Sequence, residues 1–223
     1  MVSAFLSPRH RSRVAFARAP ERMTDPMWDQ RYGVPGYAYG TAPNDFLVDV
    51  AARIPPGRVL SLGEGEGRNA VFLAARGHAV VAVDQSAVGL AKARRLAAER
   101  GVHVETVCTD LGAFAIEPGA WAGIVSVFCH LPRSIRVPLH AAIVRGLQPG
   151  GVFVLEAYTP AQLGRGTGGP GVPELLFSLA ELKVELQGLD FLHGVERERE
   201  IHEGNHHHGV GAVVQILARK PGG

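Results

Sequence analysis

The chain has 223 residues, of which 46% are hydrophobic and 20% are charged. This balance is typical of a folded globular protein and excludes a disordered or fibrous chain. The 23 basic and 21 acidic side chains nearly cancel, so the charge predicts no nucleic-acid partner. No apolar run approaches the roughly 18 residues of a membrane helix, and the first 22 residues lack the apolar core of a signal peptide. We therefore expect no membrane contact and a cytoplasmic location.

The first part of the chain divides into a tail and two helical segments. Residues 1–22 are arginine-rich without sustained helical periodicity, which predicts a flexible tail. An overlong translational start is favoured there over an organelle presequence. Residues 23–57 contain two short helical patterns, and the first puts Trp28 and Tyr32 one turn apart on one face. Residues 58–223 form the expected main domain.

From residue 58 onward, apolar strand-like segments alternate with helices. Five such strands separated by helices predict a parallel sheet covered on both faces, and the last two strand-like runs predict an antiparallel hairpin at its edge. The expected fold is α/β, a doubly wound, mostly parallel seven-stranded sheet with a terminal antiparallel hairpin. The predicted strands are 58–62, 78–84, 102–108, 123–129, 152–158, 189–200 and 211–220, and the predicted helices are 68–76, 87–100, 134–147 and 174–186.

The segment VLSLGEGEGRN, residues 59–69, joins the first strand to a helix through three alternating glycines. Such a turn brings backbone close to a ligand. The third glycine comes too early for a dinucleotide fingerprint, and no lysine completes a phosphate loop. Glu64 and Glu66 would repel a pyrophosphate, which favours a cationic, phosphate-free ligand such as S-adenosylmethionine. The alternative is that both glutamates point to solvent.

Two acidic residues follow the next strands. Asp84 ends the second strand, where a carboxylate can accept hydrogen bonds from a ribose diol. Its alternative role is to cap the next helix, although Ser86 is the more natural cap. Asp110 and Leu111 follow the third strand and could meet an adenine edge, but an aspartate there is equally typical of a turn.

The order and spacing of these motifs, with LQPGG before the fifth strand and the closing hairpin, resemble the class I S-adenosylmethionine-dependent methyltransferases. WDQRYGVPGYAYGTAPNDFL and GEGEGRNAVFLAARGHAVVAVDQS are similar to the small-molecule enzymes of the tellurite-resistance (TehB-like) or thiopurine type. The resemblance implies S-adenosylmethionine as cofactor, S-adenosylhomocysteine as product, and residues 23–57 as a helical lid. The cofactor-binding residues it implies are Trp28, Tyr32, Gly63, Glu64, Gly65, Gly67, Asn69, Asp84, Gln85, Asp110, Leu111 and Phe128.

Histidines and cysteines supply the remaining candidates. His130 follows the fourth strand and could take a proton from an acceptor, although a packed histidine at the start of the next helix is favoured. Cys108 and Cys129 are expected to be buried, inert thiols without a disulfide. His202, His206, His207 and His208 favour a solvated turn over a metal site, with the option that the hairpin loop reaches over the site. We predict no metal.

The resulting functional hypothesis is methyl transfer from S-adenosylmethionine to a small-molecule acceptor. A thiol or chalcogen nucleophile suits a sequence without an evident catalytic dyad, since it needs little base assistance. If the acceptor atom is oxygen or nitrogen, His130 is the candidate base. The alternatives are a non-catalytic nucleoside-binding module and a nicotinamide-dependent oxidoreductase. The sequence does not identify the acceptor or the oligomeric state.

Overall fold

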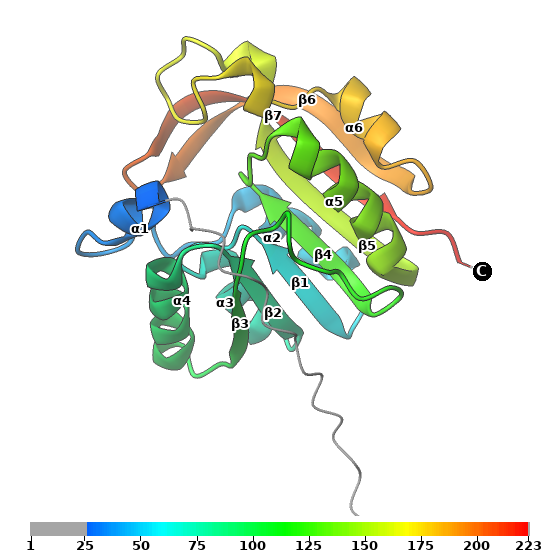
Figure 1. The fold of residues 1–223 in the computed structure, drawn as a ribbon, viewed down its shortest axis with the longest axis horizontal. Helices are drawn as coiled ribbons and strands as arrows, with labels where there is room; N and C mark the ends of the chain where they lie inside the picture. The colour runs from blue at the N-terminus through cyan, green and yellow to red at the C-terminus, as the bar shows by residue number, and fades with distance from the viewer. Residues whose placement is uncertain (1–25, 223) are drawn as a thin grey trace, which may run out of the picture.

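Seven strands form one mixed sheet in the computed structural model, which describes residues 26–222 (Figure 1). Their order is β3-β2-β1-β4-β5-β7-β6, and the pairs from β3 to β5 are parallel, whereas β7 runs antiparallel to both β5 and β6. This arrangement confirms the predicted fold class. The strands are β1 (Arg58–Leu62), β2 (Ala79–Asp84), β3 (Val104–Cys108), β4 (Trp121–Val127), β5 (Leu147–Tyr158), β6 (Asp190–Glu203) and β7 (His207–Arg219).

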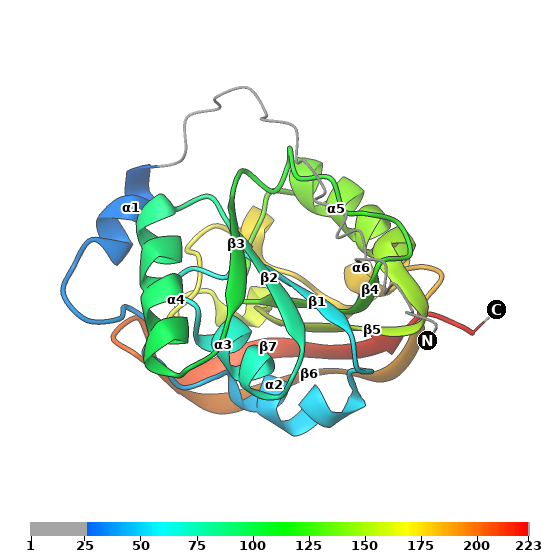
Figure 2. The ribbon, with the colours of Figure 1, turned by 90° about the horizontal axis from the view of Figure 1, so that it is seen from below.

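Helices cover both faces of the sheet (Figure 2). Apolar residues of α2, α3 and α4 pack on one face, and those of α5 and α6 pack on the other. The α-helices are α1 (Pro26–Tyr32), α2 (Asp45–Val50), α3 (Arg68–Ala75), α4 (Ala87–Glu99), α5 (Arg133–Gly146) and α6 (Leu179–Glu185). Short 3₁₀ turns are η1 (Ala51–Arg53), η2 (Pro160–Gln162) and η3 (Pro173–Leu175). No helix within residues 26–222 is long and apolar enough to cross a membrane.

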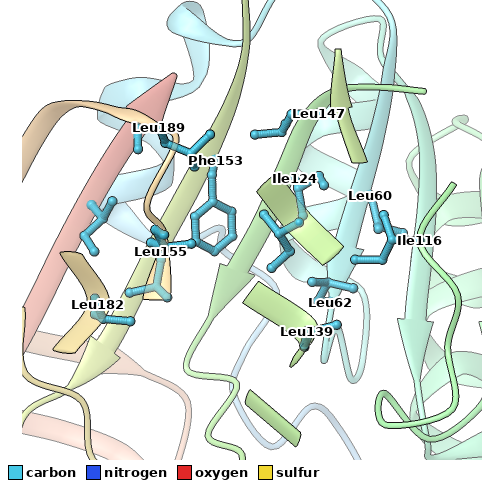
Figure 3. Packing of buried hydrophobic residues seen from close by; sticks show 14 of the residues in the cluster. Leu60, Leu62, Ile116, Ile124, Leu139, Leu147, Phe153, Leu155, Leu182 and Leu189 are labelled. Atoms are coloured by element: carbon cyan, nitrogen blue, oxygen red, sulfur yellow. The ribbon is translucent and has the colours of Figure 1, made fainter. Parts of the chain in front are cut away.

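The core beneath α5 and α6 shows why the strands are mostly apolar (Figure 3). Leu60 and Leu62 of β1 belong to this cluster, whereas Val59, which precedes Leu60, packs into the cluster on the other face. Alternate strand residues point to opposite faces, so a strand covered on both sides needs apolar residues at every position. Each such leucine contributes about 1.5–3 kcal/mol by leaving water. This burial fixes the sheet edge at which the strands end and ligands collect.

Several boundaries differ from the prediction, and the larger differences lie in the second half of the chain. Residues 174–186 do not form one helix, because Ser178 adopts an extended conformation and caps α6 in a reciprocal capping box with Glu181. Strand β5 begins at Leu147 and so includes the LQPGG segment. The hairpin strands β6 and β7 are also longer than predicted, which brings their connection to the edge of the sheet beside α1 (Figure 1).

One further prediction is wrong, and another falls on residues that the structure does not describe. Cys108 is exposed rather than buried, since it ends the outer strand β3, although both cysteines are free as predicted. The predicted tail, residues 1–22, and the first residues of the predicted 23–57 segment lie outside the described residues.

Candidate active site

A cavity of about 710 Å³ opens at the carboxyl ends of the parallel strands. Its walls come from α1, the glycine loop, the segments after β2, β3 and β4, the 168–171 loop and the β6–β7 connection. It brings together most of the residues that the sequence singled out. Those lining it are Trp28, Tyr32, Gly63, Glu64, Asn69, Asp84, Gln85, Asp110, Leu111, Phe128 and His130.

Gly65 and Gly67 do not line the cavity, and close packing explains their identity. Both have positive φ angles, of 61° and 97°. A Cβ atom on Gly65 would lie 2.5 Å from the hydroxyl oxygen of Tyr32, and one on Gly67 would lie 2.6 Å from Cα of Ala93. These glycines therefore let α1 and α4 close onto the loop. Trp28 and Tyr32 stack with ring centroids 5.5 Å apart, as expected from their spacing.

Both glutamates of the loop are buried, so the alternative that they point to solvent is wrong. Glu64 accepts hydrogen bonds from the backbone N–H groups of Asn69 and Ala70, each at 3.0 Å, and a short one from the Ser61 hydroxyl. It thereby satisfies free N–H groups at the start of α3. Burial nevertheless raises the pKa of Glu64.

Glu66 anchors the segment after α1. Its carboxylate accepts the backbone N–H of Ala38 at 2.6 Å and pairs with Nζ of Lys92 at 2.8 Å. Both loop carboxylates therefore form hydrogen bonds or ion pairs within the protein. The charge of Glu66 is compensated by Lys92 without a ligand.

Asp84 lies where the ribose-binding prediction requires it. It is only 6% exposed, and its two carboxylate oxygens accept the backbone N–H groups of Gly65 and Ser86, each at 2.8 Å. Each oxygen keeps acceptor capacity for a ligand. Burial raises the pKa of Asp84. Ser86 is the residue that caps α4, through the N–H of Gly89, so the alternative of Asp84 as the cap is wrong.

Asp110 is a turn residue that also lines the cavity. Its carboxylate accepts the N–H of Gly112 at 2.6 Å within a turn, and both Asp110 and Leu111 line the cavity. A turn residue can therefore also present its side chain to a ligand.

Arg68 is a lining residue that the sequence reasoning did not select. Its Nη2 atom donates to Glu203 at 2.7 Å, and the residue is 8% exposed. Its Nη1 atom is buried and has no hydrogen-bond partner within residues 26–222. A buried, unpartnered guanidinium nitrogen costs free energy, and an anionic ligand group would satisfy it. The adjacent glycine loop was the only sequence signal for this position.

His130 lies in the cavity wall with both ring nitrogens engaged. Nδ1 lies 2.7 Å from the carbonyl oxygen of Leu175, which can only accept, and Nε2 accepts the N–H of Tyr158 at 3.4 Å. Burial lowers the pKa of His130 to about 4. It is therefore a weakly basic, packed histidine at neutral pH. Burial raises the pKa of the neighbouring Cys129 to about 12, as expected for an inert thiol.

The four histidines of the hairpin separate into two pairs. His202 and His208 are exposed, with Nδ1 atoms 3.2 Å apart, whereas His206 and His207 line the cavity. The hairpin loop therefore does reach the site. No group of three or more metal-binding side chains occurs in the described part of the chain.

His207 has a carboxylate behind it and aromatic rings around it. Its Nδ1 atom lies 3.5 Å from Glu203, and its ring centroid lies 4.7 Å from those of Tyr39 and Phe128. Burial lowers the pKa of His207, partly offset by Glu203. The sequence alone could not rank it above its three neighbours.

Comparison with known proteins identifies a methyltransferase domain over residues 59–151. The chain is 31% identical over 117 residues to the 2-heptyl-1-hydroxyquinolin-4(1H)-one methyltransferase of Mycobacteroides abscessus. This alignment covers 51% of this chain and 52% of that protein. It is 33% identical over 110 residues to a probable S-adenosyl-L-methionine-dependent methyltransferase TehB of Haemophilus influenzae, covering 48% of this chain and 37% of that protein. The matches thus span about half or less of these relatives.

Solved structures share the fold. The crystal structure of TehB from Haemophilus influenzae superposes with a TM-score of 0.68 at 24% identity, covering 86% of this chain and 65% of that one. A structure associated with the conversion of a disulfide bond into a thioacetal group during echinomycin biosynthesis gives 0.70 at 19% identity, covering 90% and 92%. The chain therefore contains a methyltransferase domain over residues 59–151, and in its fold and its curated relatives it is similar to S-adenosylmethionine-dependent methyltransferases of the TehB-like type.

Proposed function

We propose that this chain transfers a methyl group from S-adenosylmethionine to a small-molecule acceptor. The observation that carries the proposal is one cavity lined by Asp84, the Asp110–Leu111 pair and Arg68, whose Nη1 atom is buried without a partner in the described chain. The curated relative from Mycobacteroides abscessus, whose name gives a small quinolinone as its substrate, supports the acceptor class.

The cavity residues suit the parts of this cofactor. Asp84 would accept hydrogen bonds from the ribose hydroxyls, and Asp110 with Leu111 would border the adenine. Arg68 would pair with the carboxylate of the methionine moiety, which satisfies its free Nη1 atom. When bound, the cofactor supplies an electrophilic methyl group. The chain's own contribution is to orient the reactants and exclude water, with Trp28 and Tyr32 of the proposed 23–57 lid at the cavity wall.

Isothermal titration calorimetry with S-adenosylhomocysteine tests the cofactor assignment. Replacing Asp84 with alanine removes a charged acceptor, so we expect binding weaker by about 10- to 100-fold, as for loss of a hydrogen bond to a charged group. Asp49→Ala is the matched control, because Asp49 is exposed on α2, away from the cavity. Absence of binding by the wild-type protein, or wild-type affinity in Asp84→Ala, would contradict the assignment.

A panel of acceptors tests turnover. The expectation of a thiol or chalcogen nucleophile stays a prediction, and it rested on the lack of an evident base. Formation of S-adenosylhomocysteine should therefore be measured with thiols, chalcogen oxyanions, phenols and amines. Cofactor binding without transfer to any member of this panel would favour the non-catalytic alternative.

A further inference from the structure

We propose that His207, oriented by Glu203, is the general base of this site, and that the acceptor is a flat aromatic compound bearing a hydroxyl group. This inference rests on the proposed methyl transfer and names its acceptor class and its base.

The first step of the argument is the hydrogen bonding of His207. A carboxylate only accepts, so the contact of 3.5 Å between Glu203 and Nδ1 of His207 requires the proton on Nδ1. The lone pair then lies on Nε2, and no hydrogen bond to that atom occurs within residues 26–222. Because the ring lines the cavity, Nε2 is left for a ligand. This carboxylate–histidine pairing fixes the tautomer that a general base needs.

The second step is the charge behind the histidine. Glu203 also accepts hydrogen bonds from Arg68 at 2.7 Å and from Asn44 at 2.9 Å. Burial alone would raise its pKa, but the His207 and Arg68 contacts lower the pKa of Glu203 to about 2. Glu203 is therefore ionised, fixed in place, and able to stabilise the imidazolium that forms when His207 takes a proton. His130 has no carboxylate in that position.

The third step is the shape of the surrounding wall. Phe128 contacts His207 edge to face at 4.7 Å and stacks on Tyr158 at the same centroid distance. Phe128 is the only non-glycine residue with a positive φ in the described chain, at 50°. Such a conformation costs about 1–3 kcal/mol and persists only where the surroundings impose it. The Tyr39 ring also lies against His207, with ring centroids 4.7 Å apart. The aromatic rings of Tyr39 and Phe128 therefore lie close to the imidazole of His207, and such surroundings suit a planar aromatic ligand.

The proposed step balances as follows. The acceptor hydroxyl gives its proton to Nε2 of His207, and an oxygen electron pair forms the bond to the methyl carbon. The electron pair of the broken carbon–sulfur bond returns to sulfur, which becomes a neutral thioether. His207 then releases its proton to solvent.

The test compares two acceptors of the same shape. At neutral pH 2-naphthol keeps its proton, whereas 2-naphthalenethiol is largely ionised and needs no base. We expect His207→Gln to lower kcat/KM for 2-naphthol by about 10²- to 10⁴-fold and to change that for the thiol only a few-fold. Glu203→Gln should show the same split, because Glu203 acts by positioning. His208→Gln, an exposed neighbour, should behave as wild type.

Two features keep the outcomes distinct. The ratio of the two rates in one preparation cancels any loss of folded protein, and calorimetry with S-adenosylhomocysteine should give wild-type affinity for His207→Gln. Three results would overturn this inference and leave methyl transfer standing. The first is an equal loss with both acceptors in His207→Gln, and the second is no loss with 2-naphthol in that variant. The third is that the wild-type protein methylates the thiol but not 2-naphthol. Failure of the wild-type protein to bind S-adenosylhomocysteine would instead overturn the proposed function and this inference with it.

Discussion

Arg68 uses only part of its guanidinium within the protein. Nη2 is paired with Glu203 at 2.7 Å, while Nη1 is buried without a partner among the described residues. Because an unsatisfied buried donor costs about 1–3 kcal/mol, the free protein carries a penalty that an anionic ligand group removes. We therefore expect the ligand group that pairs with Arg68 to be negatively charged and to lie beside the start of α3.

Arg68→Lys separates these two roles. A lysine can still pair with Glu203, but its single ammonium cannot also serve a second anion with the fork geometry of arginine. We expect S-adenosylhomocysteine to bind about 10-fold more weakly. Methylthioadenosine, which lacks the amino-acid carboxylate, should bind the variant and the wild type alike in the same calorimeter. Equal weakening of both ligands would show that Arg68 does not bind the carboxylate.

Arg68 and His207 also mark the limit of sequence reasoning at single residues. The position of Asp84 in the cavity wall was predictable because it depends only on the end of one strand, which the local pattern predicts. Arg68 acquires its meaning from Glu203, 135 positions away. Among four neighbouring histidines, only the register of the hairpin decides that His207 faces inward. The predicted base, His130, lies in the cavity wall, but both of its ring nitrogens are engaged within the protein and burial lowers its pKa to about 4.

At the scale of elements, α5 and α6 are joined by a buried ion cluster away from the cavity. Glu185 of α6 accepts from Arg136 at 2.7 Å and from His140 at 2.8 Å, both on α5. Side chains of Arg136 and Glu185 are each 3% exposed. Removing one partner of such a pair leaves a buried charge uncompensated, which costs more than the pair itself contributes.

Glu185→Ala should therefore destabilise the protein by about 3–5 kcal/mol in urea unfolding. Burial acts to raise the pKa of Glu185, but His140 and Arg136 lower it to about 2 from 4.5. A depressed pKa gives stability that is present above pH 4.5 and is lost as the pH falls toward 2. The difference between wild type and variant should shrink over that range. A difference that is constant with pH would contradict the charge-based explanation.

The elements themselves were largely predictable, because each strand is a local apolar run and each main helix has a local period. The break before α6 was predictable but was missed, since 174–186 is apolar enough for one helix. Ser178 with Glu181 is a capping box that a closer reading of the sequence would find. The length of β6 and β7 depends instead on pairing between strands, which no local pattern specifies.

At the scale of the whole molecule, a buried polar network ties the N-terminal segment to the sheet and the hairpin. Asn44 donates its side-chain amide to Glu156 of β5 and to Glu203 of β6, and its backbone N–H donates to Asn69 of α3. Arg199 pairs with Glu156 at 2.7 Å. The N-terminal segment, α3 and the hairpin are therefore held together by a buried network that contains charged side chains. We expect cofactor binding and the position of the N-terminal segment to be coupled for this reason.

Hydrogen exchange tests whether residues 23–57 act as a lid. S-adenosylhomocysteine at about 100 times its Kd should stabilise the protein by about 2.7 kcal/mol, and for a chain of this size each kcal/mol raises Tm by about 2–4 °C. That shift confirms occupancy. If α1 closes the cavity, protection should rise most in residues 26–40 and in the hairpin loop 204–206, because these backbones leave solvent only when the ligand is held. Protection confined to the glycine loop, with α1 unchanged, would show that α1 is a fixed wall of the cavity and not a lid.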